Sequence, residues 1–260
     1  VVLKGRLPKG VYAKDIILYL AGLLGANGAN YKALEFCGDG VATLSVEERM
    51  TITNMVIELG GKCGLMPCDD TLREWLHGRV EGEIEGVAAD DDAVYCQTVE
   101  VDLDKLCPQV AKPHKVDNVS PIAEVEGTPV QHAIIGTCTN GRIEDLEVAA
   151  RILDGKKIAH GMTLTISPAS KAVYIEAIHR GYVETFLRAG ATIAIPGCSG
   201  CSGGAYVGIP ADGEAVITTA NRNFKGRLGN ANSFLYLASP ATVAASALTG
   251  CIEDSRNYVR

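Results

Sequence analysis

Ala191-Thr-Ile-Ala-Ile-Pro-Gly-Cys-Ser-Gly-Cys201 decides the fold class, because a short apolar strand runs directly into a glycine-rich loop that carries two thiols. The same order, an apolar strand, then a polar loop with glycine, then a helix, recurs through residues 132–260. The expected strands cover residues 133–136, 163–166, 191–195, 215–219 and 233–238. Strands that alternate with helices predict a mainly parallel sheet flanked by helices. We therefore expect an α/β protein.

Capping residues mark two of the helices between these strands. Ser167 is followed by proline, which predicts a helix over residues 168–180 with Ser167 as its N-cap. Ser239, also followed by proline, predicts a last helix that ends at Gly250.

Residues 1–103 mix helices and strands. A periodic apolar segment predicts a helix at residues 13–24, and a capping box of Ser45 and Glu48 opens a second helix at residues 45–59. One side of this second helix is apolar and consists of Ile52, Met55, Val56 and Leu59. The opposite side consists of Glu47, Thr51, Asn54 and Glu58, and spacing alone favours a solvated face there. Residues 95–103 alternate like an edge strand.

A proline-bearing stretch separates the two segments. Residues 104–131 contain four prolines and few apolar clusters, which is typical of an ordered connection between domains. We therefore predict one α/β domain over residues 1–103 and a second over residues 132–260.

Composition limits the function classes. The chain has 260 residues, of which 47% are apolar, and this is enough to fill real cores. A net charge of -7 with scattered lysine and arginine argues against nucleic acid as the main partner. No apolar run is long enough to span a bilayer, and no signal peptide opens the chain. We therefore expect a cytoplasmic protein that does not associate with a membrane. In a reducing compartment nine cysteines favour free thiols, core residues or metal ligands over a disulfide framework.

Unusual side chains follow three of the expected strands. Cys138 follows one strand, Cys198 and Cys201 follow another, and Asn221, Arg222 and Arg227 follow a third. Ligands of open parallel sheets bind at the carboxyl ends of the strands. We therefore expect thiols and guanidinium groups to face one crevice.

Three thiols at this spacing allow several kinds of site. A structural zinc normally needs a fourth ligand, and none lies at zinc-like spacing. A redox pair would use only the two cysteines of Cys-x-x-Cys, normally at the start of a helix early in the chain. A disulfide is also possible in principle. Three thiolates that hold a cubane cluster and leave one iron open are the better explanation.

The motifs together resemble those of the aconitase superfamily. The motifs that carry the resemblance are Gly136-Thr-Cys-Thr-Asn-Gly-Arg142, Pro196-Gly-Cys-Ser-Gly-Cys201 and Asn221-Arg-Asn-Phe-Lys-Gly-Arg227. Residues 10–18, 35–40 and 44–55 fit the same pattern, so the resemblance covers nearly the whole chain. More narrowly, the chain is similar to the large subunits of 3-isopropylmalate dehydratase, homoaconitase and dimethylmalate dehydratase.

This resemblance implies two α/β domains of the aconitase type and a 4Fe-4S cluster held by Cys138, Cys198 and Cys201. It implies that Asn221, Arg222 and Arg227 bind substrate, and that Asn54 and Glu58 lie near the cluster as catalytic residues, while Glu47 and Thr51 keep the solvated interpretation. The implied reaction is the isomerisation of a dicarboxylic or tricarboxylic 2-hydroxy acid by loss and return of water. Among the enzymes that the chain resembles, the first expectation is 3-isopropylmalate dehydratase, an enzyme of leucine biosynthesis.

The chain also departs from the pattern of these relatives. They carry an N-terminal domain ahead of the strand that begins at Val1, and a swivelling domain that forms a separate small subunit in the dehydratases. Neither is matched here, so we expect a small-subunit partner and no turnover by the chain alone. A non-catalytic RNA-binding iron sensor, disfavoured by the acidic charge, and an inert remnant of the fold are the rival functions.

Overall fold

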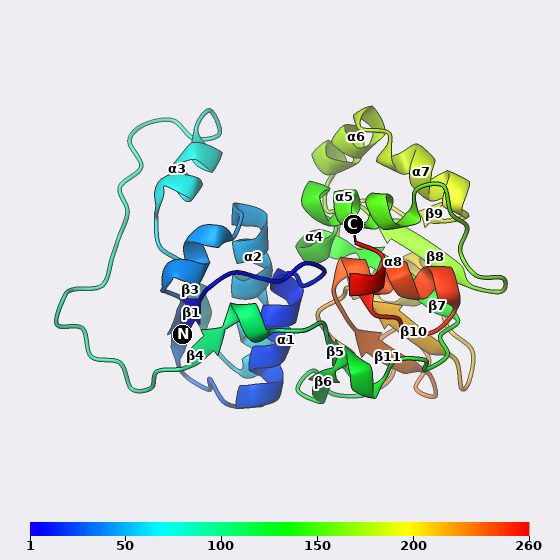
Figure 1. Ribbon diagram of the computed structural model, residues 1–260, viewed down its shortest axis with the longest axis horizontal. Helices are drawn as coiled ribbons and strands as arrows, with labels where there is room; N and C mark the ends of the chain where they lie inside the picture. The colour runs from blue at the N-terminus through cyan, green and yellow to red at the C-terminus, as the bar shows by residue number, and fades with distance from the viewer. Residues whose placement is uncertain (260) are drawn as a thin grey trace.

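The computed structural model describes residues 1–259 as two packed bodies, one built around a pair of helices and one around a sheet (Figure 1). The N-terminal body contains α1, α2 and the short strands β1 to β4, and the C-terminal body contains the strands β5 to β11. No helix among the described residues is both long and apolar enough to cross a bilayer.

One seven-stranded sheet organises the C-terminal body, with the order β6-β5-β11-β10-β7-β8-β9. Strands β11, β10, β7, β8 and β9 pair in parallel, whereas β5 and β6 add an antiparallel edge. The strands are β5 (Gln109–Ala111), β6 (Val119–Pro121), β7 (His132–Gly136), β8 (Thr163–Ser167), β9 (Thr192–Ile193), β10 (Ala215–Thr218) and β11 (Phe234–Leu237). The prediction of a mainly parallel sheet flanked by helices is confirmed.

Alternate residues of the sheet enter two different clusters, as the pleat of a strand requires. Ile135 and Ile217 face the main core, which α5 and α8 cover, while their neighbours Ile134 and Val216 face a smaller cluster on the other side. The helices of this body are α4 (Thr137–Asn140), α5 (Ile143–Leu153), α6 (Lys171–His179), α7 (Tyr182–Ala189) and α8 (Pro240–Thr249).

The N-terminal body packs two helices against two small parallel sheets. Its helices are α1 (Ala13–Leu24), α2 (Val46–Met55) and α3 (Asp70–Leu76), and its sheets pair β1 (Val2–Lys4) with β4 (Glu100–Asp102) and β2 (Ala33–Glu35) with β3 (Cys63–Leu65). Short 3₁₀ turns are η1 (Asp39–Thr43), η2 (Val56–Leu59), η3 (Leu103–Lys105), η4 (Ile122–Glu124), η5 (Ser199–Ser202), η6 (Gly204–Tyr206) and η7 (Ser255–Asn257). The edge strand expected at residues 95–103 is present only as β4.

The predicted caps had different outcomes. The capping box of α2 is confirmed, since Ser45 Oγ accepts from the Glu48 amide at 3.1 Å and Glu48 Oε2 accepts from the Ser45 amide at 2.9 Å. The cap at Ser167 is wrong, because this residue ends β8 and its hydroxyl donates to the Ile195 carbonyl at 3.2 Å. Ser170 caps α6 instead.

The segment 104–131 contributes β5 and β6 to the edge of the large sheet. Buried apolar residues form one cluster mainly from residues 3–59 and 101–111 and another mainly from residues 110–252. Ala220 and Leu237 of the C-terminal body belong to the first cluster, so the two bodies share packing. The division into domains at residues 104–131 stays a prediction.

Candidate functional site

Three loops at the carboxyl ends of parallel strands meet the polar side of α2 and η2. Cys138 lies in α4 directly after β7, and Cys198 and Cys201 lie at η5 after β9. Asn221, Arg222 and Arg227 lie in the loop after β10. Helix α4 contacts both α2 and η5, so the C-terminal loops and the N-terminal helix share one region.

A glycine and a threonine fix the turn that presents Cys138. Gly136 has φ 144°, and a Cβ there would lie 2.1 Å from the Ser167 carbonyl oxygen, so no larger residue fits. Thr219 Oγ1 accepts from the Gly136 amide at 2.8 Å and donates to the Gly136 carbonyl at 3.1 Å. The start of the Cys138 loop is therefore tied to β10, the strand that leads to the arginines.

The three thiols are free and reachable. Cys138 and Cys198 are exposed, Cys201 is half-buried, and the Cys201 amide donates to the Cys198 carbonyl at 2.7 Å. The neighbouring Cys138 thiol, with a contribution from burial, raises the pKa of Cys198, which reflects how close the two sulfur atoms lie.

Cysteine thiolates are the ligands that iron-sulfur clusters use, so the three free thiols fit such a group by their chemistry. Among residues 1–259 no three His, Cys, Asp or Glu side chains are close enough to share one metal ion. A cubane cluster binds each cysteine through a different iron, so its ligands stand further apart than those of one ion. The buried hydroxyls of Thr137 and Ser199, each next to a predicted ligand, lack a hydrogen-bond partner in the part of the chain that the structure describes, and could donate to inorganic sulfide.

The predicted polar residues lie together across the two bodies. Arg222 Nε donates to Glu58 Oε1 at 2.8 Å, and the Glu58 side chain is only 11% exposed. Asn54 Nδ2 and Asn221 Nδ2 both donate to Thr139 Oγ1, at 2.8 and 3.1 Å. The helix face that carries Asn54 and Glu58 therefore meets the loop of Cys138 and the loop of Asn221.

Arg227 lies over an aromatic ring. Its guanidinium carbon is 5.2 Å from the centre of the Phe224 ring, and its buried Nε has no hydrogen-bond partner within the described residues. A cavity of about 320 Å³ is lined by Glu58, Arg222 and Phe224, among others. The cavity walls thus present the ion pair next to an aromatic ring.

Sequence reasoning missed Lys14, which is 1% exposed and lies at the centre of these contacts. Its ammonium donates to Thr219 O at 2.9 Å, Ala220 O at 3.0 Å, Asn140 Oδ1 at 3.1 Å and Asn221 Oδ1 at 3.3 Å. Burial lowers its pKa to about 8. A lysine in the first turn of a helix gives no sequence signal of burial, because such residues are normally exposed.

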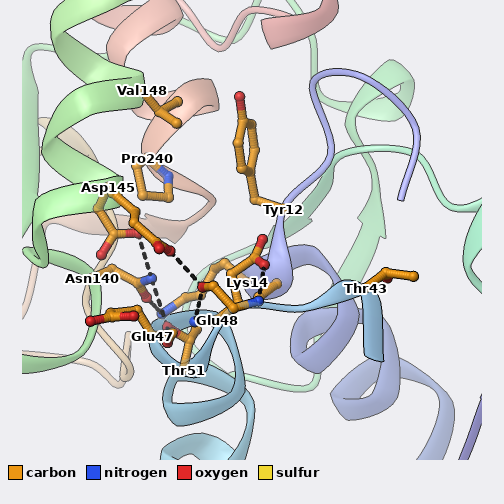
Figure 2. Close-up of a pocket in the computed structure, with 13 residues that line it drawn as sticks. Tyr12, Lys14, Thr43, Glu47, Glu48, Thr51, Asn140, Asp145, Val148 and Pro240 are labelled. Atoms are coloured by element: carbon orange, nitrogen blue, oxygen red, sulfur yellow. Dashed lines mark hydrogen bonds between the residues drawn. The ribbon is translucent and has the colours of Figure 1, made fainter. Parts of the chain in front are cut away.

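A second cavity, of about 300 Å³, opens beside Lys14 between α2 and α5 (Figure 2). Asn140 Nδ2 donates to Thr51 Oγ1 at 3.2 Å and to Asp145 Oδ1 at 3.3 Å on one wall. Burial raises the pKa of Asp145 to about 7. Sequence reasoning also missed Asn140 and Asp145.

The interpretation of Thr51 as part of a solvated face is wrong. Its side chain is 2% exposed because α4 packs on α2 and covers it. Glu47, one turn earlier, stays half-exposed and accepts from Trp75 Nε1 at 2.9 Å. Spacing could not separate these two residues, because the covering element comes from the other body.

The chain is similar in sequence to several known proteins. The model of the aconitase family (aconitate hydratase) matches residues 1–127 and 123–250. The 3-isopropylmalate dehydratase large subunit 2 of Archaeoglobus fulgidus is 52% identical over 100% of this chain and 62% of its own length. The "Probable methanogen homoaconitase large subunit" of Methanosarcina mazei is 52% identical over 97% of this chain and 64% of its own length.

The chain thus spans less than two thirds of the length of these relatives. Among solved structures, the crystal structure of Thermococcus kodakaraensis aconitase X in its holo-form has a TM-score of 0.47 at 15% identity, covering 88% of this chain and 52% of that one. The family match and the two relatives together show that the chain belongs to the aconitase family.

Proposed function

We propose that this chain is the large-subunit portion of a 4Fe-4S hydro-lyase that isomerises a 2-hydroxy dicarboxylic acid by dehydration and rehydration. The observation that supports the proposal is that the three cysteines and the two arginines all lie in loops that follow parallel strands of one sheet. The names of the relatives favour 3-isopropylmalate as substrate. Homoaconitase or 2,3-dimethylmalate dehydratase activity is the alternative, and a relative named for homoaconitase supports the first of these.

Cys138, Cys198 and Cys201 would hold the cluster. When bound through three cysteines, such a cluster supplies an open iron that acts as a Lewis acid toward a hydroxyl leaving group. Thr137 and Ser199 would donate their unpartnered hydroxyl protons to its sulfides.

The arginines would bind the carboxylates of the substrate. A guanidinium presents a planar fork that matches a carboxylate, and Arg227 Nε has no partner among residues 1–259. Removing a proton next to a carboxylate adds negative charge to it. A well-placed donor in a dry site stabilises such charge by about 3 kcal/mol.

Glu58 and Asn54 would complete the site from the N-terminal body. The Glu58 carboxylate is nearly buried and is held by Arg222, so it can accept a proton or a hydroxyl hydrogen bond at Oε2 while Oε1 stays paired. Asn54 orients Thr139, the residue after Cys138.

The partner that we propose is a small subunit that carries the swivelling domain, since the relatives are named as large subunits. A cytoplasmic location remains a prediction from the sequence.

Anaerobic reconstitution with iron and sulfide tests the cluster. We expect wild type to bind iron and sulfide in equal amounts and to absorb in the visible range, and Cys198→Ser to lose both properties. Cys251→Ser is the matched control, because Cys251 is a free thiol that follows the C-terminal end of α8 and pairs with Pro129 in an isolated bridge, so this variant should load normally. A Cys198→Ser variant with a full complement of cluster would overturn the ligand assignment.

The substrate is tested with the large subunit of which this chain is the proposed portion, assembled with a small subunit from the same source. A panel of 3-isopropylmalate, homocitrate and dimethylmalate should give one preferred substrate. An assembled, cluster-loaded enzyme that dehydrates none of the three would refute the proposed reaction.

A further inference from the structure

Lys14 belongs to the N-terminal body, and its side chain reaches two loops of the C-terminal body. It lies in the first turn of α1 and is fully buried, and its ammonium reaches Asn140 in the Cys138 loop and Asn221 in the arginine loop. No residue of the C-terminal body itself makes this pair of contacts among the described residues.

The contacts of this ammonium are all with uncharged oxygens. An ammonium has three protons, and four acceptors compete for them, so the group is saturated. Carboxylates of Asp145, Glu58 and Asp15 and the Cys201 thiol stabilise its charge from a distance, and within residues 1–259 none of them forms an ion pair with it. Its position is therefore set by the two loops rather than by a partner charge.

The ammonium also fixes which way two amides face. Asn140 Oδ1 points to Lys14, so Asn140 Nδ2 must face Thr51 and Asp145, and these are the bonds observed. Asn221 Oδ1 points to Lys14, so Asn221 Nδ2 faces Thr139 Oγ1. With either amide flipped, an NH₂ group would meet the ammonium.

We propose that Lys14 is a positioning residue that sets the Cys138 loop and the Asn221–Arg222 loop in register with each other, and with α2, for cluster binding. This inference rests on the proposed function. It assigns Lys14 no contact with substrate or cluster, and it requires that cluster retention depend on Lys14 more than on overall stability.

The test compares two neighbouring buried residues of α1. Lys14→Met removes the ammonium and keeps most of the volume. Asp15→Asn is the matched control, because Asp15 is equally buried but accepts from the amides of Tyr12 at 2.8 Å and Gln109 at 2.9 Å, away from the loops. Both variants should unfold at a lower denaturant concentration than wild type.

After anaerobic reconstitution, we expect Lys14→Met to hold iron about 10-fold or more weakly against a chelator, as outer-shell changes typically do. Asp15→Asn should match wild type in this assay. Equal iron retention in both variants, or a loss that follows the loss of stability, would overturn the inference. A wild-type chain that takes up no cluster would instead refute the proposed function, so the two failures are distinguishable. A crystal structure of Lys14→Met with both amides in their present orientation would also contradict the inference.

Discussion

The two sides of the helix formed by α2 and η2 make contacts of different kinds. The apolar side, with Ile52, Met55 and Val56 fully buried, packs inside the N-terminal body. The polar side bonds to loops of the C-terminal body through hydrogen bonds and one ion pair, which bury Thr51 and most of Glu58, whereas Asn54 stays exposed. The comparison teaches that a polar helix face can be an interface to a site rather than a surface to water.

If this division is correct, changes on the apolar side should alter stability and changes on the polar side should alter function. Each face also offers a control residue on the same helix that lacks the relevant contacts. The variants below test the division in order of expected effect.

Ile52→Ala should have the largest effect on stability. Ile52 is fully buried in the N-terminal core, and such truncations typically cost about 2–5 kcal/mol because they remove contacts and leave a cavity. Urea unfolding measures the loss. Ile57→Ala, at a 53% exposed position, is the control and should cost less than about 1 kcal/mol. Similar losses for the two variants would contradict the assignment of the apolar side.

Glu58→Gln should reduce turnover with little effect on stability. If Glu58 exchanges a proton during the reaction, kcat in the cluster-loaded enzyme assembled with its small subunit should fall about 100-fold or more. The stability loss should stay within about 1 kcal/mol, because Arg222 is half-exposed and can be hydrated.

Glu47→Gln is the control for this change. Glu47 lies on the same polar side but accepts from Trp75 and makes no contact with the arginine loop, so its variant should keep wild-type kcat. Wild-type turnover in Glu58→Gln would remove Glu58 from the proposed mechanism.

Much of the fold could be predicted because its signals are local. The capping box at Ser45, the proline after Ser239 and the glycines that end helices each act within a few residues, and the structure has those helix ends. The failed cap at Ser167 shows the limit of such signals. There a tertiary contact, the bond to the Ile195 carbonyl, keeps the residue in its strand.

The candidate site was predictable only where chemistry is unusual. Cysteines and arginines directly after predicted strands indicated a site, because the carboxyl ends of parallel strands lie at the same edge of a sheet. Lys14 gave none, since a lysine in a helix is normally exposed. Its burial depends on two loops more than 120 residues away, which no local pattern encodes.

Thr51→Val should have the smallest effect and sharpen the comparison most. The change keeps the shape of a buried side chain and removes one acceptor of Asn140 Nδ2, which still donates to Asp145. We therefore expect a loss of about 1 kcal/mol in urea unfolding. Thr53→Val is the control, because the Thr53 hydroxyl donates to the Arg49 carbonyl of its own helix at 3.0 Å. If the two variants behave alike, the bond between Thr51 and Asn140 adds nothing across the bodies, and the polar side of α2 would reduce to Asn54 and Glu58.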